Sequence, residues 1–188
     1  MNELFKNEMK TILKDEYDDF IQSLQKPPVK AFYLNPLKKD CLHYFNQDAI
    51  SPHPVVPDGY YFDYEKYPLG KSPFFSCGLY YIQEPSAMPV AHFLDIQKDD
   101  YVLDMCGAPG GKSCAVASRL GPQGLMITND INTLRAKILS ENIERFGLKN
   151  TIVTNCDPIQ FTKILPEFFD KIILDAPCSG EGMFRKDE

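Results

Sequence analysis

The sequence lacks the features of a membrane-bound or secreted protein. None of its apolar runs approaches the roughly 20 residues that a helix needs to span a bilayer. Its first residues, Met1 to Lys6, do not have the charged and then apolar layout of a signal peptide. Six cysteines at irregular spacing indicate no disulfide framework, and the absence of a CxxC pair speaks against a zinc site. We therefore expect a cytoplasmic protein with reduced thiols and no metal.

Positive charge is also scarce. With 20 basic and 26 acidic residues, the formal net charge is −6. Proteins that bind nucleic acids are usually basic on at least one face, so this balance argues against strong nucleic-acid binding by these residues alone. It leaves room for a local basic groove. The histidines, His43, His53 and His92, lack the spacing of metal ligands, and we expect them to have structural roles.

The remaining composition is that of an ordinary globular protein. The 188 residues, 44% apolar and 24% charged, suffice for one domain, or for one domain with a small appendage. Residues 3–24 carry apolar side chains at helical spacing and predict one amphipathic helix, which Pro27 and Pro28 stop. Residues 29–70 are rich in proline and aromatic residues, which is typical of short strands and turns.

From about residue 85 the pattern alternates between helix and strand. A helix at 85–94 precedes four apolar runs, and helical segments separate these runs. Such alternation predicts βαβ units and a parallel sheet, and hence an α/β fold. The expected strands are 101–105, 125–128, 151–154 and 171–174, and the expected helices between them are 111–120, 132–146 and 158–165.

Each of the four apolar runs ends near an aspartate. These are Asp104, Asp130, Asp157 and Asp175, and the first run opens into a glycine-rich turn at 107–111. Ligands of parallel α/β sheets bind at the carboxyl ends of the strands, where all four carboxylates are expected. Glycines let a backbone approach a ligand closely, and carboxylates hydrogen-bond hydroxyl and amino groups. The arrangement therefore predicts a site for a nucleoside-type cofactor.

The glycine turn invites comparison with the phosphate-binding loop GxxxxGK[ST]. That motif needs a glycine five positions before Gly111, where this sequence has Cys106, and counting from Gly107 gives a loop that is one residue too short. Asp104 would also place a carboxylate beside the phosphates. A nucleotide-hydrolysing domain is therefore a weaker alternative. A non-catalytic module that docks RNA or protein is another. A tight turn without a ligand is a third, but two adjacent glycines after a proline, following Asp-x-Cys, are more than a turn requires.

The carboxylates have simpler explanations too. Asp130 is expected to grip ribose hydroxyls, or else to be a solvated loop residue. Asp157 is expected to meet an adenine amino group, or else to cap the helix that follows it. In Asp175-Ala176-Pro177-Cys178 a carboxylate and a thiol flank a rigid proline and form the candidate reaction centre, or else a strand end beside a buried cysteine. We expect the other cysteines to be core or incidental residues: Cys41, Cys77, Cys114 and Cys156.

Two motifs resemble those of the Nol/Nop/Sun family of RNA cytosine-5 methyltransferases, and most of all its bacterial ribosomal-RNA members of the RsmF type. The family's cofactor loop, DxCAAPGGK[TS], is matched by Asp104–Ser113, with Gly107 at the position of the first alanine. Its DAPCSGxGxxR segment is matched by Asp175–Arg185, and residues 78–87 resemble the segment that leads into the catalytic domain. The match covers about residues 28–188.

The resemblance implies that S-adenosylmethionine donates a methyl group to C5 of a cytosine in RNA, and its RsmF type implies ribosomal RNA. Residues 107–112 would cradle the methionine part, Asp130 would hold the ribose, and Asp157 would approach the adenine. Asp175 would hydrogen-bond N3 of the cytosine, and Cys178 would assist breakdown of a covalent intermediate. The candidate cofactor-binding residues are Asp104, Cys106, Gly107, Ala108, Pro109, Gly110, Gly111, Lys112, Asp130, Arg135, Asp157 and Asp175, and the candidate catalytic residues are Asp175 and Cys178.

The sequence also departs from the family pattern. The family's attacking cysteine follows a fifth strand, and its RNA-binding extension comes later still; this sequence contains neither segment. DNA cytosine-5 methyltransferases attack instead with the cysteine of a Pro-Cys dipeptide, which leaves Cys178 open as a nucleophile. We therefore expect a partial Rossmann-like methyltransferase domain at 76–188, catalytically incomplete and prone to self-association. A small α+β lead-in domain at 1–75, a candidate for RNA contact, precedes it.

Overall fold

The structure is a computed structural model that describes residues 2–38 and 41–178. The chain divides into two compact units. One consists of residues 1–28 with 177–188, and the other is Val29–Ala176. Each unit is described by itself.

The first unit contains two short helices. Asn2 begins α1 (Glu3–Leu13) by accepting the N–H of Leu4, and α2 (Tyr17–Gln25) follows after a 3-10 turn at Lys14–Glu16. The prediction of one helix over 3–24 was therefore wrong. Lys14 adopts a φ of 49°, which an α-helix does not accommodate, so the chain turns there although the apolar spacing continues.

The larger unit begins with an antiparallel sheet in the order β2-β3-β1-β4. Phe32, at the centre of this sheet, lies opposite Tyr60 on one side and Ile82 on the other. The strands expected within 29–70 are confirmed, but the fourth strand was not predicted. The elements are β1 (Lys30–Leu34), β2 (Ile50–Pro52), β3 (Gly59–Phe62), the short helix α3 (Pro73–Ser76) and β4 (Tyr80–Gln83).

The second sheet is parallel, as the alternation of helix and strand predicted. Its order is β7-β6-β5-β8, so the direction in which strands are added reverses beside β5. In an open α/β sheet such a reversal marks the crevice where ligands bind. The elements are α4 (Met88–Phe93), β5 (Tyr101–Asp104), α5 (Gly111–Ala117), β6 (Leu125–Asn129), α6 (Thr133–Phe146), β7 (Thr151–Thr154), α7 (Ile159–Ile164) and β8 (Lys171–Ile173).

Local chemistry sets the ends of α6, the longest of these helices. Asn132 caps its start by accepting the N–H groups of Leu134 and Arg135. Gly147 ends it with a φ of 80°, a left-handed conformation that glycine adopts without strain. Asp130 lies two residues before this cap, and its position is therefore fixed by both the strand and the helix that flank it.

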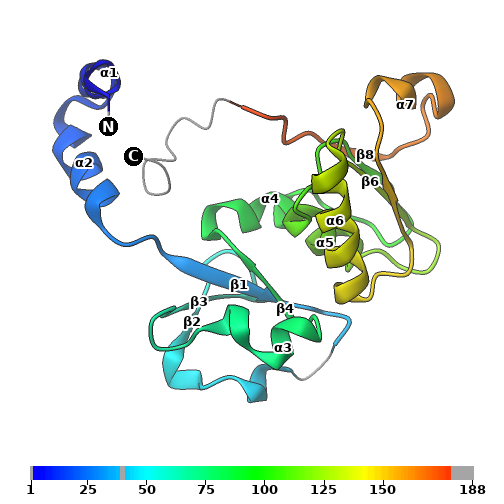
Figure 1. Ribbon diagram of the computed structural model, residues 1–188, viewed down its shortest axis with the longest axis horizontal. Helices are drawn as coiled ribbons and strands as arrows, with labels where there is room; N and C mark the ends of the chain where they lie inside the picture. The colour runs from blue at the N-terminus through cyan, green and yellow to red at the C-terminus, as the bar shows by residue number, and fades with distance from the viewer. Residues whose placement is uncertain (1, 39–40, 179–188) are drawn as a thin grey trace. The chain divides into compact units, whose positions relative to one another are not determined.

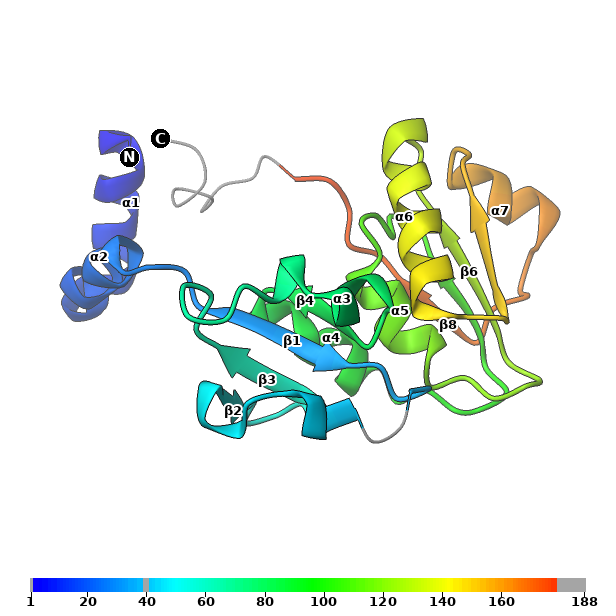
Figure 2. The ribbon, with the colours of Figure 1, turned by 60° about the horizontal axis from the view of Figure 1, so that its bottom comes forward.

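Helices cover both faces of the parallel sheet (Figures 1 and 2). On one face, Val102 and Met126 share a core with Leu139 of α6 and with the buried residues of α5. The same core includes Tyr33 and Tyr81 of the antiparallel sheet, so α5 lies between the two sheets. On the other face, Leu103 and Ile127 pack against Phe161 of α7 in a smaller cluster.

The division into domains at 75/76 stays a prediction. Strand β4 lies after that point in the sequence and pairs with β1 in the antiparallel sheet. The two sheets also share a core within Val29–Ala176. Among the described residues, no helix is long and apolar enough to cross a membrane.

Candidate functional site

Asp104, the last residue of β5, lies beneath the glycine turn. Its side chain is buried, and its Oδ2 accepts a hydrogen bond from Ser113 Oγ at 2.7 Å. Burial raises the pKa of Asp104, and the hydrogen bond from Ser113 opposes that shift. Ser113 Oγ also lies 2.8 Å from Thr128 Oγ1 in β6. These bonds connect the ends of two neighbouring strands to the first turn of α5.

Two glycines allow the turn to lie close to its neighbours. A Cβ on Gly107 would lie 2.1 Å from Thr128 Oγ1 and 2.8 Å from Ser113 Oγ, which is too close for either pair of atoms. The N–H of Gly107 donates to the carbonyl of Asn129 at 2.7 Å. Gly110 has a φ of 115°, in the region that favours glycine. A side chain would clash at Gly107 and strain the backbone at Gly110, which explains the glycine at both positions.

Asp130 is buried at the carboxyl end of β6, with an exposed fraction of 2%. Its Oδ1 accepts the N–H of Asn132 at 2.9 Å. Its Oδ2 has no hydrogen-bond partner among the described residues, although Arg135 Nη2 lies 3.4 Å away. Leaving a buried carboxylate oxygen without a hydrogen-bond donor is costly, so this atom is a candidate acceptor for a ligand's hydroxyl or amino group. Burial also rules out the alternative of a solvated loop residue.

Arg135 connects Asp130 to the glycine turn. Besides its ion pair with Asp130, its Nη2 donates to the carbonyl of Ala108 at 2.8 Å. Two helical turns further along α6 there is a second link, because Asn142 Nδ2 donates to the carbonyl of Pro109 at 2.8 Å. Helix α6 thus holds two consecutive carbonyls of the turn.

Asn129 is a residue that the sequence analysis missed. It is fully buried, and its Oδ1 accepts the N–H of Cys156 and the hydroxyl of Thr154, at 3.0 and 2.9 Å. Its Nδ2 donates to the carbonyls of Met105 and Cys156. The side chain therefore joins the segments that follow β5 and β7 to β6. The polar run 128–130 at the end of an otherwise apolar strand was the available signal.

Asp157, after β7, is exposed, and its Oδ1 accepts the N–H of Ile159 at 3.0 Å. This bond satisfies the first N–H group of α7, but the N-cap position of that helix is Pro158, which makes no side-chain cap bond. The expected contact with an adenine stays a prediction.

Lys112 and Asp175 form an ion pair across the strand reversal, with Nζ 2.7 Å from Oδ2. The lysine side chain is 21% exposed and the aspartate 62%, so the pair lies at the rim of the site. In a phosphate-binding loop a lysine here would contact phosphates; in this chain it contacts a carboxylate. That pairing speaks against the nucleotide-hydrolysing alternative.

Cys178 and Pro177 belong to the other unit, where Cys178 is an exposed free thiol. Its expected catalytic role stays a prediction. The remainder of the second motif, including Arg185, lies outside the described residues.

The remaining residues to place are Cys106 of the glycine turn, two buried cysteines and His53. Burial raises the pKa of Cys106, and the nearby carboxylates of Asp104 and Asp130 raise it further. Cys41 and Cys114 are buried. His53 accepts the N–H groups of two loop residues, as a structural histidine does. Within the part of the chain that the structure describes, no group of three or more His, Cys, Asp or Glu side chains could hold a metal ion.

Family models match both parts of the chain. The model described as 16S rRNA methyltransferase RsmB/F matches residues 91–188, and that of the N-terminal domain of 16S rRNA methyltransferase RsmF matches residues 1–85. The chain belongs to the RsmB/F family. The match at residues 91–188 includes the glycine turn and all four strand-end aspartates.

Relatives in the RsmB/F family are considerably longer. The chain is 41% identical over 197 residues to the ribosomal RNA small subunit methyltransferase F of Vibrio vulnificus (strain YJ016). It is 40% identical over 181 residues to that of Salmonella newport (strain SL254). These matches cover 99% and 91% of the chain but 42% and 38% of the relatives. The chain therefore spans less than half the length of the curated relatives it matches.

Solved structures show the same fold. A methyltransferase homologue from Pyrococcus horikoshii superimposes with a TM-score of 0.86 at 28% identity, covering 99% of this chain and 62% of the homologue. NSun6 from Pyrococcus horikoshii, solved with SFG, gives a TM-score of 0.81 at 20% identity, covering 94% of this chain and 71% of NSun6. The Rossmann-like α/β fold expected from the sequence is thereby confirmed.

Proposed function

We propose that this chain holds S-adenosylmethionine for the transfer of a methyl group to C5 of a cytosine in ribosomal RNA. The observation that carries the proposal is the buried Oδ2 of Asp130, which forms an ion pair with Arg135 but has no hydrogen-bond donor among the described residues, beside the glycine turn at the carboxyl edge of the parallel sheet. Membership of a family of 16S rRNA methyltransferases supports the reaction class. SFG, present in the NSun6 structure, is an analogue of S-adenosylmethionine and supports the cofactor.

The residues present fit an adenosyl cofactor. Asp130 Oδ2 can accept a hydrogen bond from a ribose hydroxyl, and the loop 107–111, whose glycines pack closely against neighbouring residues, is assigned to the methionine part. Asp157 is assigned to the adenine amino group. Bound S-adenosylmethionine supplies an electrophilic methyl group. The acceptor chemistry then depends on the residues that face the cytosine.

C5 of cytosine is a poor nucleophile, so the reaction needs covalent help. A thiolate forms a bond to C6, the electrons of the C5–C6 double bond move toward C5, and C5 takes the methyl group as S-adenosylhomocysteine leaves. A base then removes the C5 proton, the C5–C6 double bond re-forms, and the C6–S bond breaks to release the thiolate. Asp175, whose Oδ2 lies 2.7 Å from Lys112 Nζ, is assigned to N3 of the cytosine: N3 takes up a proton from solvent as the thiolate adds, and the carboxylate accepts a hydrogen bond from the resulting N3–H. Cys178 is assigned to the expulsion step.

Residues 1–188 are proposed not to turn over by themselves. The family resemblance assigns attack on C6 to a cysteine after a fifth strand, and the sequence contains no such segment.

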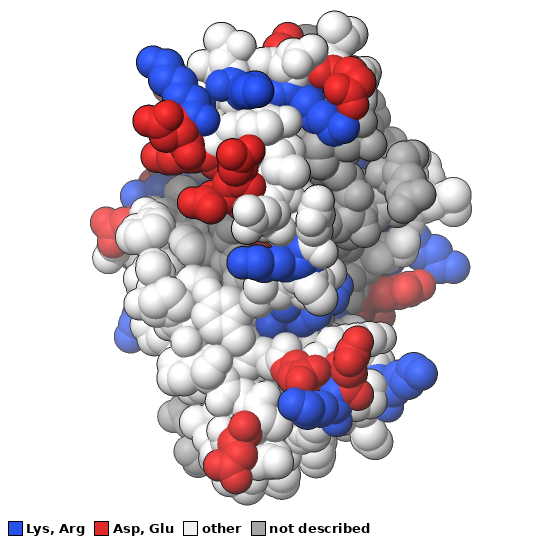
Figure 3. Space-filling model, turned by 90° about the vertical axis from the view of Figure 1, so that its left-hand side faces the viewer, with Lys and Arg blue, Asp and Glu red and all other residues white. Residues whose placement is uncertain are grey.

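The charges on the surface suit RNA binding that this chain shares with other segments. On the face drawn in Figure 3, basic and acidic side chains are interspersed rather than separated into a basic field. We assign RNA contact to the lead-in domain at 1–75 together with segments that the longer relatives carry, and a cytoplasmic location to the whole protein.

Isothermal titration calorimetry with S-adenosylhomocysteine and with ATP–Mg²⁺ tests the cofactor assignment. The wild-type chain is expected to bind the first ligand in preference to the second. Asp130→Asn should weaken binding by about 1–3 kcal/mol, because a ribose hydroxyl then loses its charged acceptor. Asp170→Asn is the matched control, because Asp170 accepts the Tyr101 N–H at the opposite end of β5. Tight binding of ATP alone would overturn the assignment, and equal affinities of both variants would remove Asp130 from the ribose site.

A denaturing gel with labelled RNA tests the assignment of the thiols in the corresponding full-length protein. Cys178→Ala is expected to attack cytosine but to release product poorly, so a covalent protein–RNA adduct should accumulate. Replacement of the downstream cysteine should abolish that adduct. If Cys178→Ala abolishes it instead, Cys178 is the nucleophile.

A further inference from the structure

Gly111, the first residue of α5, is held by the antiparallel sheet. Tyr33 of β1 donates its hydroxyl to the Gly111 carbonyl, with the two oxygens 2.8 Å apart. Two residues of β4 pack against the glycine from the side: a Cβ on Gly111 would lie 2.8 Å from Gln83 Nε2 and 3.3 Å from Tyr81 Cε1. Three side chains of one sheet thus enclose a single residue of the cofactor loop.

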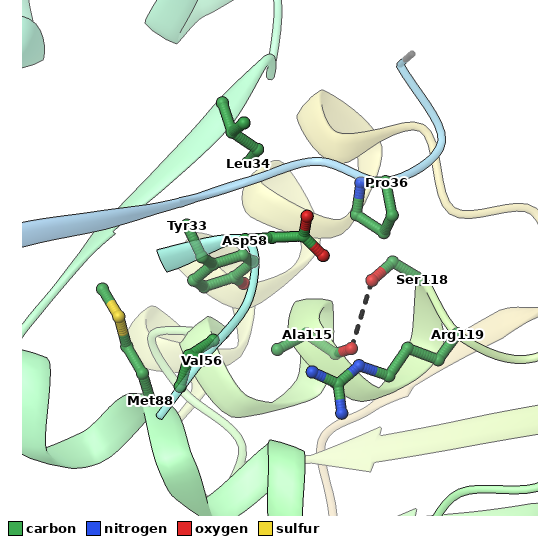
Figure 4. Close-up of a pocket in the computed structure, with 9 residues that line it drawn as sticks. All are labelled: Tyr33, Leu34, Pro36, Val56, Asp58, Met88, Ala115, Ser118 and Arg119. Atoms are coloured by element: carbon green, nitrogen blue, oxygen red, sulfur yellow. Dashed lines mark hydrogen bonds between the residues drawn. The ribbon is translucent and has the colours of Figure 1, made fainter. Parts of the chain in front are cut away.

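Tyr33 is itself firmly placed. Its ring stacks on Tyr81 with centroids 5.7 Å apart and meets Phe146 of α6 edge-on, also at 5.7 Å. Figure 4 shows the ring between β1 and the helix that carries Ala115. Burial raises the pKa of Tyr33 well above its ordinary value, so the hydroxyl remains a hydrogen-bond donor throughout the working pH range.

We infer that Tyr33 is a positioning residue for the cofactor site: its hydrogen bond fixes the Gly111 carbonyl and thereby the backbone of the loop 107–112. The backbone of the two consecutive glycines, Gly110 and Gly111, has more conformational freedom than a pair of any other residue type would have. A bond from outside the loop removes part of that freedom before the cofactor arrives, so less ordering remains to oppose binding. The inference rests on the proposed function, because it concerns the loop assigned to the methionine part.

Tyr80 offers a matched control within the same sheet. It is fully buried, and its hydroxyl donates to the Leu69 carbonyl at 2.8 Å, the same length as the bond made by Tyr33. Its ring packs with Phe32 and Phe45, in the cluster on the face of the sheet that is turned away from α5. Tyr33→Phe and Tyr80→Phe therefore each delete a hydroxyl-to-carbonyl hydrogen bond of the same length, and only the bond of Tyr33 reaches the cofactor loop.

The test compares wild type, Tyr33→Phe and Tyr80→Phe in two measurements. Urea unfolding should show similar losses of stability in the two variants. Calorimetric titration with S-adenosylhomocysteine should show a dissociation constant raised roughly three- to tenfold in Tyr33→Phe and unchanged in Tyr80→Phe. If Tyr33→Phe does not fold, Gln83→Ala removes a second of the three side chains that enclose Gly111 and should weaken binding in the same sense.

The outcomes separate the inference from the proposed function. Absence of binding by the wild-type chain would overturn the proposed function and this inference with it. Binding by wild type with equal affinity in Tyr33→Phe would overturn the inference alone. Equal weakening in Tyr33→Phe and Tyr80→Phe would also overturn it, because the effect would then follow general stability rather than contact with the loop.

Discussion

Replacing Gly107 by alanine tests the close packing between the cofactor loop and β6. The backbone at Gly107 does not have the positive φ found at Gly110, so alanine is not excluded by conformation. The family pattern even carries alanine at this position. The main obstacle in this chain is Thr128, whose Oγ1 would lie 2.1 Å from the new Cβ, and Ser113 Oγ would also be too close, at 2.8 Å. The substitution therefore sets one methyl group against two buried hydroxyls, of which that of Thr128 is the nearer.

The expected cost follows from the surroundings of Thr128. The residue is fully buried, and its hydroxyl is 2.8 Å from Ser113 Oγ, so it has little room to move away. Overpacking of such a site costs about 2–3 kcal/mol, which corresponds to a decrease in Tm of about 4–12 °C in a chain of this size. Thr128→Ala removes the nearer of the two hydroxyls. The double variant should therefore be more stable than the sum of the single effects predicts, by about 1–3 kcal/mol.

Urea unfolding followed by circular dichroism, on wild type, both single variants and the double variant, measures this coupling. Gly70→Ala is the control, because a Cβ there would meet only Ile82 Cδ1, at 3.8 Å, and should change stability little. Strict additivity of Gly107→Ala and Thr128→Ala would refute the packing described for the loop.

Three further predictions concern ionisation, association and thiol reactivity. Burial raises the pKa of Asp104 in the folded state above its value in the unfolded state. The stability of wild type should therefore fall relative to that of Asp104→Asn as the pH rises from the ordinary aspartate pKa to the folded one. A difference in urea unfolding that does not change with pH would contradict this. Ile172 is 51% exposed on β8, which has a partner strand on one side only among the described residues. The chain should therefore self-associate, and Ile172→Lys should reduce the self-association measured by sedimentation velocity. A monomeric wild type would count against this prediction. The exposed Cys77 and Cys178 should be alkylated quickly at neutral pH, whereas Cys114, whose pKa burial raises to about 12, should react only after unfolding; mass spectrometry showing early modification of Cys114 would refute its placement.

The parallel sheet could be predicted because its information is local. Each strand is a short apolar run, and each helix between strands has its own ends, such as Asn132 and Gly147 on α6. Strand β4 could not be found in this way. Its residues Tyr80–Gln83 become a strand by pairing with β1, nearly fifty residues earlier, and no local signal records that partner. The break at Lys14 was missed because apolar spacing continues through it.

The candidate site, like the fold, has features that could be predicted from the sequence and features that could not. Asp104 and Asp130 could be located because the end of a strand is visible in the sequence and parallel strands end at one edge. What the sequence does not show is how each carboxylate is surrounded. Burial of Asp130 with one oxygen lacking a hydrogen-bond donor, the links made by Asn129, and the reach of Tyr33 to Gly111 all arise from segments brought together by the fold.

The most direct test of the central claim is a crystal structure of this chain with S-adenosylhomocysteine. The account predicts a ribose hydroxyl within hydrogen-bond distance of Asp130 Oδ2, about 2.5–3.0 Å, with the amino-acid part of the ligand against the backbone of 107–112. A ligand bound elsewhere, or bound here with Asp130 Oδ2 still lacking a donor, would contradict it.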